Sequence, residues 1–164
     1  MSRSHYWSIF AMVPQQHVYV VESMGKFQRL LEPGLNFLLP VIHSVAYKHS
    51  LKENVINVDS QNAITYDNVK LRIDGVLYYK ITDPEKASYN VKEPIRAMSL
   101  LAQTSMRSEI GKIELDRTFK ERENLNNLIR NQVNQASEHW GIQCMRYEIK
   151  DISPPEQIRR SMEL

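Results

Sequence analysis

The sequence has a single cysteine and no hydrophobic run long enough to cross a bilayer as a helix. Cys144 alone cannot form an internal disulfide bond, and its isolation excludes a cysteine-rich metal site. The apolar and aromatic run HYWSIFAMV, residues 5–13, has about half of the roughly 20 residues that a transmembrane helix needs. We therefore expect residues 1–13 to form a short N-terminal segment that either packs on the fold or lies at a membrane interface.

Motifs for catalysis and metal binding are also missing. The chain has no G-x-S-x-G motif, no P-loop, no G-x-G-x-x-G motif and no H-E-x-x-H motif. Asp59–Lys70 lacks the central glycine and the terminal glutamate of a calcium loop. Cys144 lies in a predicted strand without a histidine nearby, which favours a small, half-buried residue over a nucleophile. We assign no catalytic residue, no cofactor site and no metal site, and a hydrolase is a disfavoured class.

The charge pattern argues against nucleic-acid binding. The formal net charge is +2, and basic residues alternate with acidic ones, as in KERE at residues 120–123. Such a mixture is typical of a solvated helix face and not of a basic patch. We expect no nucleic-acid partner.

A long half-buried strand organises the predicted first half. Residues 69–82 alternate between apolar residues such as Leu71 and Ile73 and charged residues such as Lys70 and Arg72. The preceding run, Asn62–Tyr66, ends in Asp67-Asn68, which favours a turn between antiparallel strands. Further short strands, separated by turns at Gly25 and at Pro33-Gly34, predict a β-rich layer before residue 82.

The apolar period then changes to that of amphipathic helices. Asp83-Pro84 predicts a helix start, and apolar residues recur every three or four positions from Ile95 to Gly111. Thr118 and Glu121 have the spacing of a capping box, which predicts a second long helix ending at Gly141. Its expected buried stripe consists of Leu125, Leu128, Ile129, Val133, Ala136 and Trp140.

The final alternating segment predicts a strand that returns to the sheet. In residues 142–152 we expect Met145, Tyr147 and Ile149 to share one face. A strand after two helices gives an α+β fold, in which amphipathic helices pack on an antiparallel sheet. We expect one domain over residues 14–152, and residues 153–164 to begin a C-terminal helix.

Four segments carry a resemblance to a known family. They are PGLNFLLPVIH at residues 33–43, the segment from Asp74 to Tyr89, LAQTSMRSEIGKIELD at residues 101–116, and the segment from Trp140 to Ile152. Together they resemble the stomatin and prohibitin-like SPFH (band 7) family across roughly residues 13–162. The opening VPQQ and the segments SLKENVINV and RYEIKDI are similar to its mitochondrial stomatin-like branch.

The resemblance implies a non-enzymatic, membrane-associated scaffold that oligomerises and organises lipids and partner proteins. It implies the mitochondrial inner membrane, with peripheral or monotopic association; the cytoplasmic face of another membrane is the alternative. The implied partners are lipid such as cardiolipin, SPFH proteins such as prohibitins in a homo- or hetero-oligomer, and respiratory complexes or membrane proteases. An alternative function is an accessory subunit fixed in a larger membrane complex, such as a respiratory complex, by heteromeric contacts.

Two groups of residues are candidates for these contacts. Aromatic and aliphatic side chains suit a membrane interface, and ordinary core is the alternative for residues 37–39. The candidate membrane-contact residues are Tyr6, Trp7, Ile9, Phe10, Phe37, Leu38 and Leu39. The start of the C-terminal helix, where the family continues into an assembly helix, supplies candidate oligomer or partner contacts at Arg159, Arg160 and Met162. The printed residues include neither the presequence nor the Ala/Glu-rich coiled coil of the family pattern.

Overall fold

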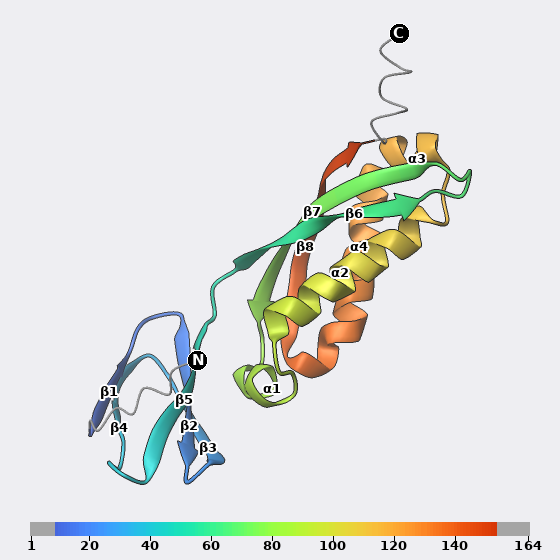
Figure 1. Cartoon of the computed structure of the whole chain (residues 1–164). Coiled ribbons are helices and arrows are strands. Elements are labelled where there is room, and N and C mark those ends of the chain that lie inside the picture. Colours follow the sequence, from blue (N-terminus) through green and yellow to red (C-terminus); the bar gives the residue numbers. More distant parts are fainter. Residues whose placement is uncertain (1–8, 154–164) are drawn as a thin grey trace.

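The computed structural model describes residues 9–153, which form two lobes (Figure 1). The small lobe, residues 9–50, contains the strands β1 (Phe10–Val13), β2 (His17–Ser23), β3 (Lys26–Leu31), β4 (Gly34–Phe37) and β5 (His43–Ser50). Residues 51–53 connect it to the large lobe, residues 54–153. Tyr6, Trp7, Arg159, Arg160 and Met162 lie outside the described residues, so their predicted contacts stay predictions.

The large lobe combines strands and helices, in the order that the change of period predicted. Its strands are β6 (Asn54–Ile64), β7 (Lys70–Ile81) and β8 (Ile142–Ser153). Its α-helices are α1 (Pro84–Tyr89), α2 (Pro94–Ile110), α3 (Leu115–Lys120) and α4 (Arg122–Ser137), and a short 3-10 helix spans Glu138–Trp140. The predicted α+β class is therefore confirmed.

The small lobe is built from two antiparallel sheets, one ordered β3-β2-β5 and the other a pair of β1 and β4. The turn between β2 and β3 contains Gly25, and Gly34 begins β4 with a φ of 117°, a conformation that glycine accepts readily. Between the sheets lies a small core of four buried residues, Val13, Val21, Leu31 and Leu38. Both predicted turns are confirmed, but the β-rich first half is divided between lobes, since β6 and β7 belong to the large one.

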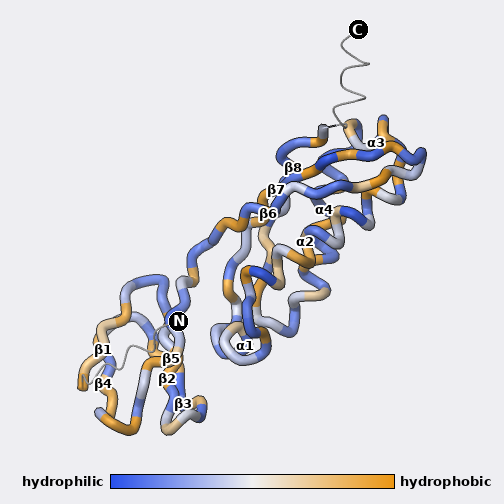
Figure 2. The backbone as a smooth tube through the Cα atoms, viewed as in Figure 1, coloured by the Kyte–Doolittle hydropathy of each residue, from blue (hydrophilic) through white to orange (hydrophobic). Residues whose placement is uncertain are grey.

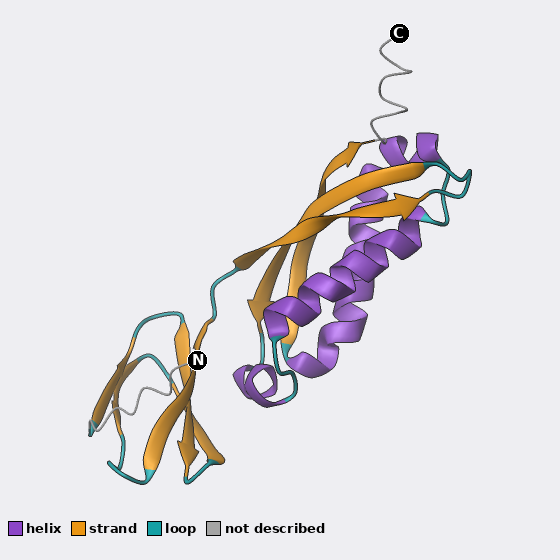
Figure 3. Cartoon of the chain, viewed as in Figure 1, coloured by secondary structure: helices purple, strands orange, loops and turns teal. Residues whose placement is uncertain are grey.

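The large lobe has a three-stranded antiparallel sheet, ordered β6-β7-β8, with helices on one face (Figure 3). The predicted hairpin is confirmed, because β6 pairs with β7 and Asn68 turns the chain with a φ of 64°. The return strand is confirmed as well, because β8 pairs with β7. The apolar side of β7 packs against α2 and α4 in a core that includes Leu77, Met98 and Ile129.

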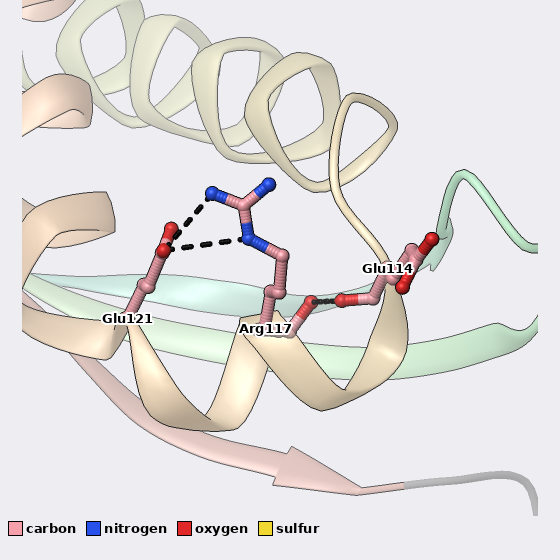
Figure 4. A network of polar contacts seen from close by, with 4 residues as sticks. Glu114, Arg117 and Glu121 are labelled. Atoms are coloured by element: carbon pink, nitrogen blue, oxygen red, sulfur yellow. Dashed lines mark hydrogen bonds and ion pairs between the residues drawn. The ribbon is translucent and has the colours of Figure 1, made fainter.

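The helix starts follow the predictions only in part. The Asp83 carboxylate accepts hydrogen bonds from the amides of Glu85 and Lys86, as an N-cap should. The predicted capping box at Thr118 and Glu121 is wrong, because a separate helix, α3, already begins at Leu115. The Thr118 hydroxyl donates to the Glu114 carbonyl at 3.0 Å, and the Glu121 carboxylate accepts from Arg117 instead (Figure 4).

The buried stripe of α4 also differs from the prediction. Leu125, Ile129 and Val133 are buried as expected, but Leu128 and Ala136 are exposed. The stripe continues to Ser137 at steps of four residues, because α4 lies along the sheet with one narrow face inward.

A bulge in β8 changes which of its residues face the core. Tyr78 pairs with Arg146 and Tyr79 with Cys144, so Met145 is an extra residue between the two pairs. Cys144 is consequently fully buried and not half-buried, whereas the Met145 side chain is exposed. Tyr147 and Ile149 are buried as predicted.

The two lobes touch through helix α1. The Tyr89 hydroxyl donates to the Glu22 carboxylate at 2.8 Å, and the Tyr89 ring packs edge-on against Tyr47. His49 Nε2 lies 2.6 Å from Ser88 Oγ. These contacts join α1 to β2 and β5, so the connection at residues 51–53 is not the only link between the lobes.

Candidate functional site

The described residues do not assemble a reactive centre. In residues 9–153 no group of three or more metal-binding side chains lies together. Burial raises the pKa of the Cys144 thiol to about 11, so at neutral pH the group is almost entirely the poorly nucleophilic thiol. An open cleft of about 460 Å³ between β2, β3 and the end of β7 is lined by Val18, Leu30 and Lys80 among others. Its charged lining residues are Glu32 and Lys80, and in the part of the chain that the structure describes no ion pair or hydrogen bond joins these two side chains.

The distinctive surface of the small lobe is one face of the β1–β4 pair. Phe10 lies opposite Phe37, and Met12 lies opposite Leu35. Since side chains alternate across a strand, these four residues share one face, which we call the apolar face. All four are exposed, and the Phe10 and Phe37 ring centroids are 5.1 Å apart. Figure 2 shows hydrophobic residues along β1 and β4, on the side of the small lobe remote from the large one.

The opposite face of the same pair closes the small core. Val13 points inward and is buried. Leu38, just beyond β4, is 5% exposed and packs in this core, with its amide donating to the Ile9 carbonyl at 2.7 Å. The prediction of a membrane contact at Leu38 is therefore corrected, because a side chain enclosed by the core is not available to lipid.

The other described candidates are at the surface. Ile9, Phe10, Phe37 and Leu39 are each more than half exposed. The structure brings them together: β1 pairs with β4, and Leu39 follows two residues after Phe37. The surface is thus assembled from two segments that are about 25 residues apart in sequence.

Sequence reasoning missed several exposed apolar residues beside these candidates. Met12 and Leu35 complete the apolar face. Val41 and Ile42 are exposed in the turn before β5, and Met24 is exposed in the turn between β2 and β3. Alternation could have identified Met12 and Leu35, but only if the pairing of β1 with β4 had been known. An apolar residue in a turn is itself a signal, because most turns are polar.

The segments that carry this surface are free of formal charge. No Asp, Glu, Lys or Arg occurs in residues 9–21 or 33–47. Arg29, on β3, borders the surface and donates a hydrogen bond to the Phe37 carbonyl. An uncharged apolar surface with a cation at its border is compatible with a lipid leaflet, where burial of a charge would be costly.

The helices of the part that the structure describes are all too short or too polar to span a bilayer.

Known proteins resemble this chain along nearly all of its length. It is 56% identical over 157 residues to "Stomatin-like protein 2, mitochondrial" of Homo sapiens, a match covering 96% of the chain and 44% of that protein. It is 55% identical over 157 residues to "Stomatin-like protein stl-1" of Caenorhabditis elegans, covering 96% of the chain and 48% of that protein. An uncharacterized protein of Methanothermobacter thermautotrophicus is 40% identical over 143 residues, which is 87% of the chain and 45% of that protein. The chain spans less than half the length of these relatives.

The family match includes both lobes. Residues 11–164 match the family described as "SPFH domain / Band 7 family". This range takes in Met12, Leu35 and Phe37 of the apolar face, and the hairpin, the helices and the return strand of the large lobe; Phe10 lies one residue before it. The resemblance seen in the four sequence segments is confirmed, and the chain belongs to the SPFH domain / Band 7 family.

Proposed function

We propose that this protein is a non-enzymatic, membrane-associated scaffold whose small lobe lies against a lipid leaflet. The observation that carries the proposal is the apolar face, where Phe10, Met12, Leu35 and Phe37 are exposed within uncharged segments. Contiguous exposed apolar patches are unusual on soluble proteins, and they mark sites of contact with a membrane or a partner.

The size of the face sets the strength of binding. Burial of one large apolar side chain contributes on the order of 1.5–3 kcal/mol before entropic costs. Four such side chains would hold a single copy to a membrane reversibly. Several copies joined in one assembly would bind far more tightly, because the second and later contacts become intramolecular. Oligomerisation, which belongs to this proposal, would therefore strengthen membrane association.

The relatives and the family resemblance support a proposal for the membrane in which the scaffold works and for its partners. The human relative is named as mitochondrial, which supports a mitochondrial location. We propose the mitochondrial inner membrane, with cardiolipin among the lipids and with SPFH proteins such as prohibitins as assembly partners. Respiratory complexes or membrane proteases would be the proteins that the scaffold organises.

The proposal is tested by placing one charge on the apolar face. Leu35→Glu should weaken partition of the full chain into phosphatidylcholine–cardiolipin vesicles roughly 10- to 100-fold, since the leucine no longer enters the lipid. Vesicle flotation measures the bound fraction. Val55→Glu is the matched control, because Val55 is also a strand residue and is 56% exposed, against 58% for Leu35, but lies on the large lobe.

A charge-balanced variant separates apolar contact from repulsion by anionic lipid. Met12→Lys together with Leu35→Glu places opposite charges directly across the β1–β4 pair, so the strand pairing is retained and net charge is unchanged. This variant should lose binding as well. Vesicle binding equal to that of the unmodified protein would contradict the proposal. Recovery of the protein at a fixed ratio with other membrane subunits would then favour the accessory-subunit alternative.

A further inference from the structure

The two most exposed large apolar side chains of the described residues lie in turns at the end of the small lobe. Met24 is 89% exposed in the turn between β2 and β3, and Val41 is 81% exposed in the turn before β5. Neither residue belongs to the apolar face of the β1–β4 pair. Both are more exposed than any residue of that face.

Both residues have a backbone conformation that is unfavourable for residues with a side chain. Met24 has a φ of 51° and Val41 a φ of 76°. Positive φ is uncommon for residues with a side chain, and a β-branched residue such as valine is a strong exception. The other described non-glycine residues with positive φ, Gln16 and Asn68, are polar. Thus two turn positions that favour Asn or Gly carry apolar side chains instead.

The two turns are neighbours. The Met24 amide donates to the Ile42 carbonyl at 3.3 Å, and Ser23 pairs with His43 where β2 and β5 meet. The Leu39 carbonyl accepts from the His43 amide at 3.0 Å, which closes the second turn. Met24 therefore lies beside the 39–42 segment, and we call Met24, Leu39, Val41 and Ile42 the tip.

We propose that the tip inserts into the acyl region of the lipid leaflet, so that the small lobe meets the membrane end-on through these two turns. This inference rests on the proposed function and names the residues that enter first. The four side chains have no charge and no hydrogen-bonding group, and residues 33–47 contain no Asp, Glu, Lys or Arg. Beside Met24, the charged residues are Glu22, whose carboxylate accepts a hydrogen bond from Tyr89, and Lys26. The tip also lies close in sequence to the apolar face, because Leu39 is two residues after Phe37.

Lipid is the occupant that this chemistry favours. Two neighbouring turns project side chains from the end of a lobe and do not form the broad, flat area that a stable protein interface needs. Acyl chains accept projecting aliphatic groups without fixed geometry, whereas charged groups at the same position would be expelled. The backbone strain at Met24 and Val41 is then retained because the side chains bind lipid.

The test uses substitutions that introduce residues suited to positive φ in the two turns and remove the apolar side chains. Met24→Asn creates an Asn-Gly turn with Gly25, and Val41→Gly creates a Pro-Gly turn after Pro40, each suited to positive φ. The full-length double variant should melt about 2–4 °C higher, because the backbone is relaxed. Its partition into vesicles of phosphatidylcholine alone should fall roughly tenfold or more, because two inserted side chains are lost.

A control and three other outcomes make the test decisive. Gln16→Gly relaxes another positive φ in the same lobe, at a polar residue, and should leave vesicle binding unchanged. A tip variant that binds like the unmodified protein, while Leu35→Glu does not, would overturn the tip and leave the proposed function standing. An unmodified protein that binds no vesicle would overturn both. A lower melting temperature of the tip variant would overturn the argument from backbone strain.

Discussion

At the scale of single residues, Gly75 is required by the side chain that lies across it. A Cβ atom at Gly75 would lie 2.3 Å from the Tyr147 hydroxyl oxygen. Tyr147 is buried, and its hydroxyl donates to Met106 Sδ at 2.9 Å, which ties β8 to α2. Burial raises the pKa of Tyr147 well above its ordinary range, so the hydroxyl keeps its proton and its donor role.

Gly75→Ala should therefore destabilise the protein by about 1–3 kcal/mol, because the new methyl group displaces Tyr147 in a packed core. Urea unfolding followed by circular dichroism measures this loss. Gly111→Ala is the matched control: its Cβ would have no neighbour closer than 3.5 Å, and its φ of −63° suits alanine. Equal stabilities of the two variants would contradict the assigned role of Gly75.

At the scale of elements, side chains of α4 form hydrogen bonds with the backbone amide and carbonyl groups along the outer edge of β8. Asn134 accepts from the Cys144 amide at 2.6 Å and donates to its carbonyl at 3.0 Å. Asn126 accepts from the Ile149 amide, and Arg122 donates to the Ile149 carbonyl. The helix residues are four, eight and twelve positions apart, so they share one side of α4. An edge strand is thereby shielded from pairing with another chain.

Removal of one such partner should open the edge locally. Asn134→Ala leaves a buried amide and carbonyl unpaired, so we expect a loss of about 1–3 kcal/mol. Hydrogen exchange should accelerate most at the Cys144 amide. Asn127→Ala removes an exposed asparagine of the same helix and should change neither quantity. An unaltered rate of hydrogen exchange at the Cys144 amide would show that Asn134 does not form a protective hydrogen bond with this amide.

Elements with local signals could be predicted from sequence, and those with distant partners could not. The β6–β7 hairpin and the α1 cap depend on residues a few positions apart, and both were predicted correctly. The bulge at Met145 arises from the pairing of β8 with β7. The failed capping box at Thr118 reflects a helix that begins one turn earlier, at Leu115.

The candidate site shows the same limit. Ile9, Phe10, Phe37 and Leu39 were chosen because they are large and apolar, and the structure exposes them. Leu38 has the same chemistry but lies in the core, and only the fold of the small lobe distinguishes it. Met12 and Leu35 belong to strands of four residues, which are too short for alternation to be read with assurance.

At the scale of the whole molecule, one of the contacts that join the two lobes contains a histidine, His49. Ser88 Oγ donates to the Pro84 carbonyl, so it accepts the proton on His49 Nε2. His49 is therefore neutral with its proton on Nε2, or fully protonated. Burial lowers the pKa of His49 below its ordinary value of 6.5, which means that the folded contact favours the neutral ring.

Acidification should weaken this contact. As the pH falls below 6.5, the unfolded chain takes up a proton at His49 more readily than the folded one, so stability decreases. His49→Gln retains a donor for Ser88 without titrating. Between neutral pH and about pH 5 the melting temperature of the unmodified protein should fall further than that of His49→Gln. Parallel pH profiles would contradict the assignment.

The division into two lobes also sets an order of folding. All five strands of the small lobe lie within residues 10–50, whereas β7 of the large lobe obtains its second neighbour only from residues 142–153. Contacts that are near in sequence form sooner, and N-terminal units generally fold first during synthesis. We therefore expect the lobe with the apolar face and the tip to complete its fold on the ribosome before the large lobe does. The newly made chain would then expose the apolar face and the tip first, at the stage when aggregation competes most strongly with folding.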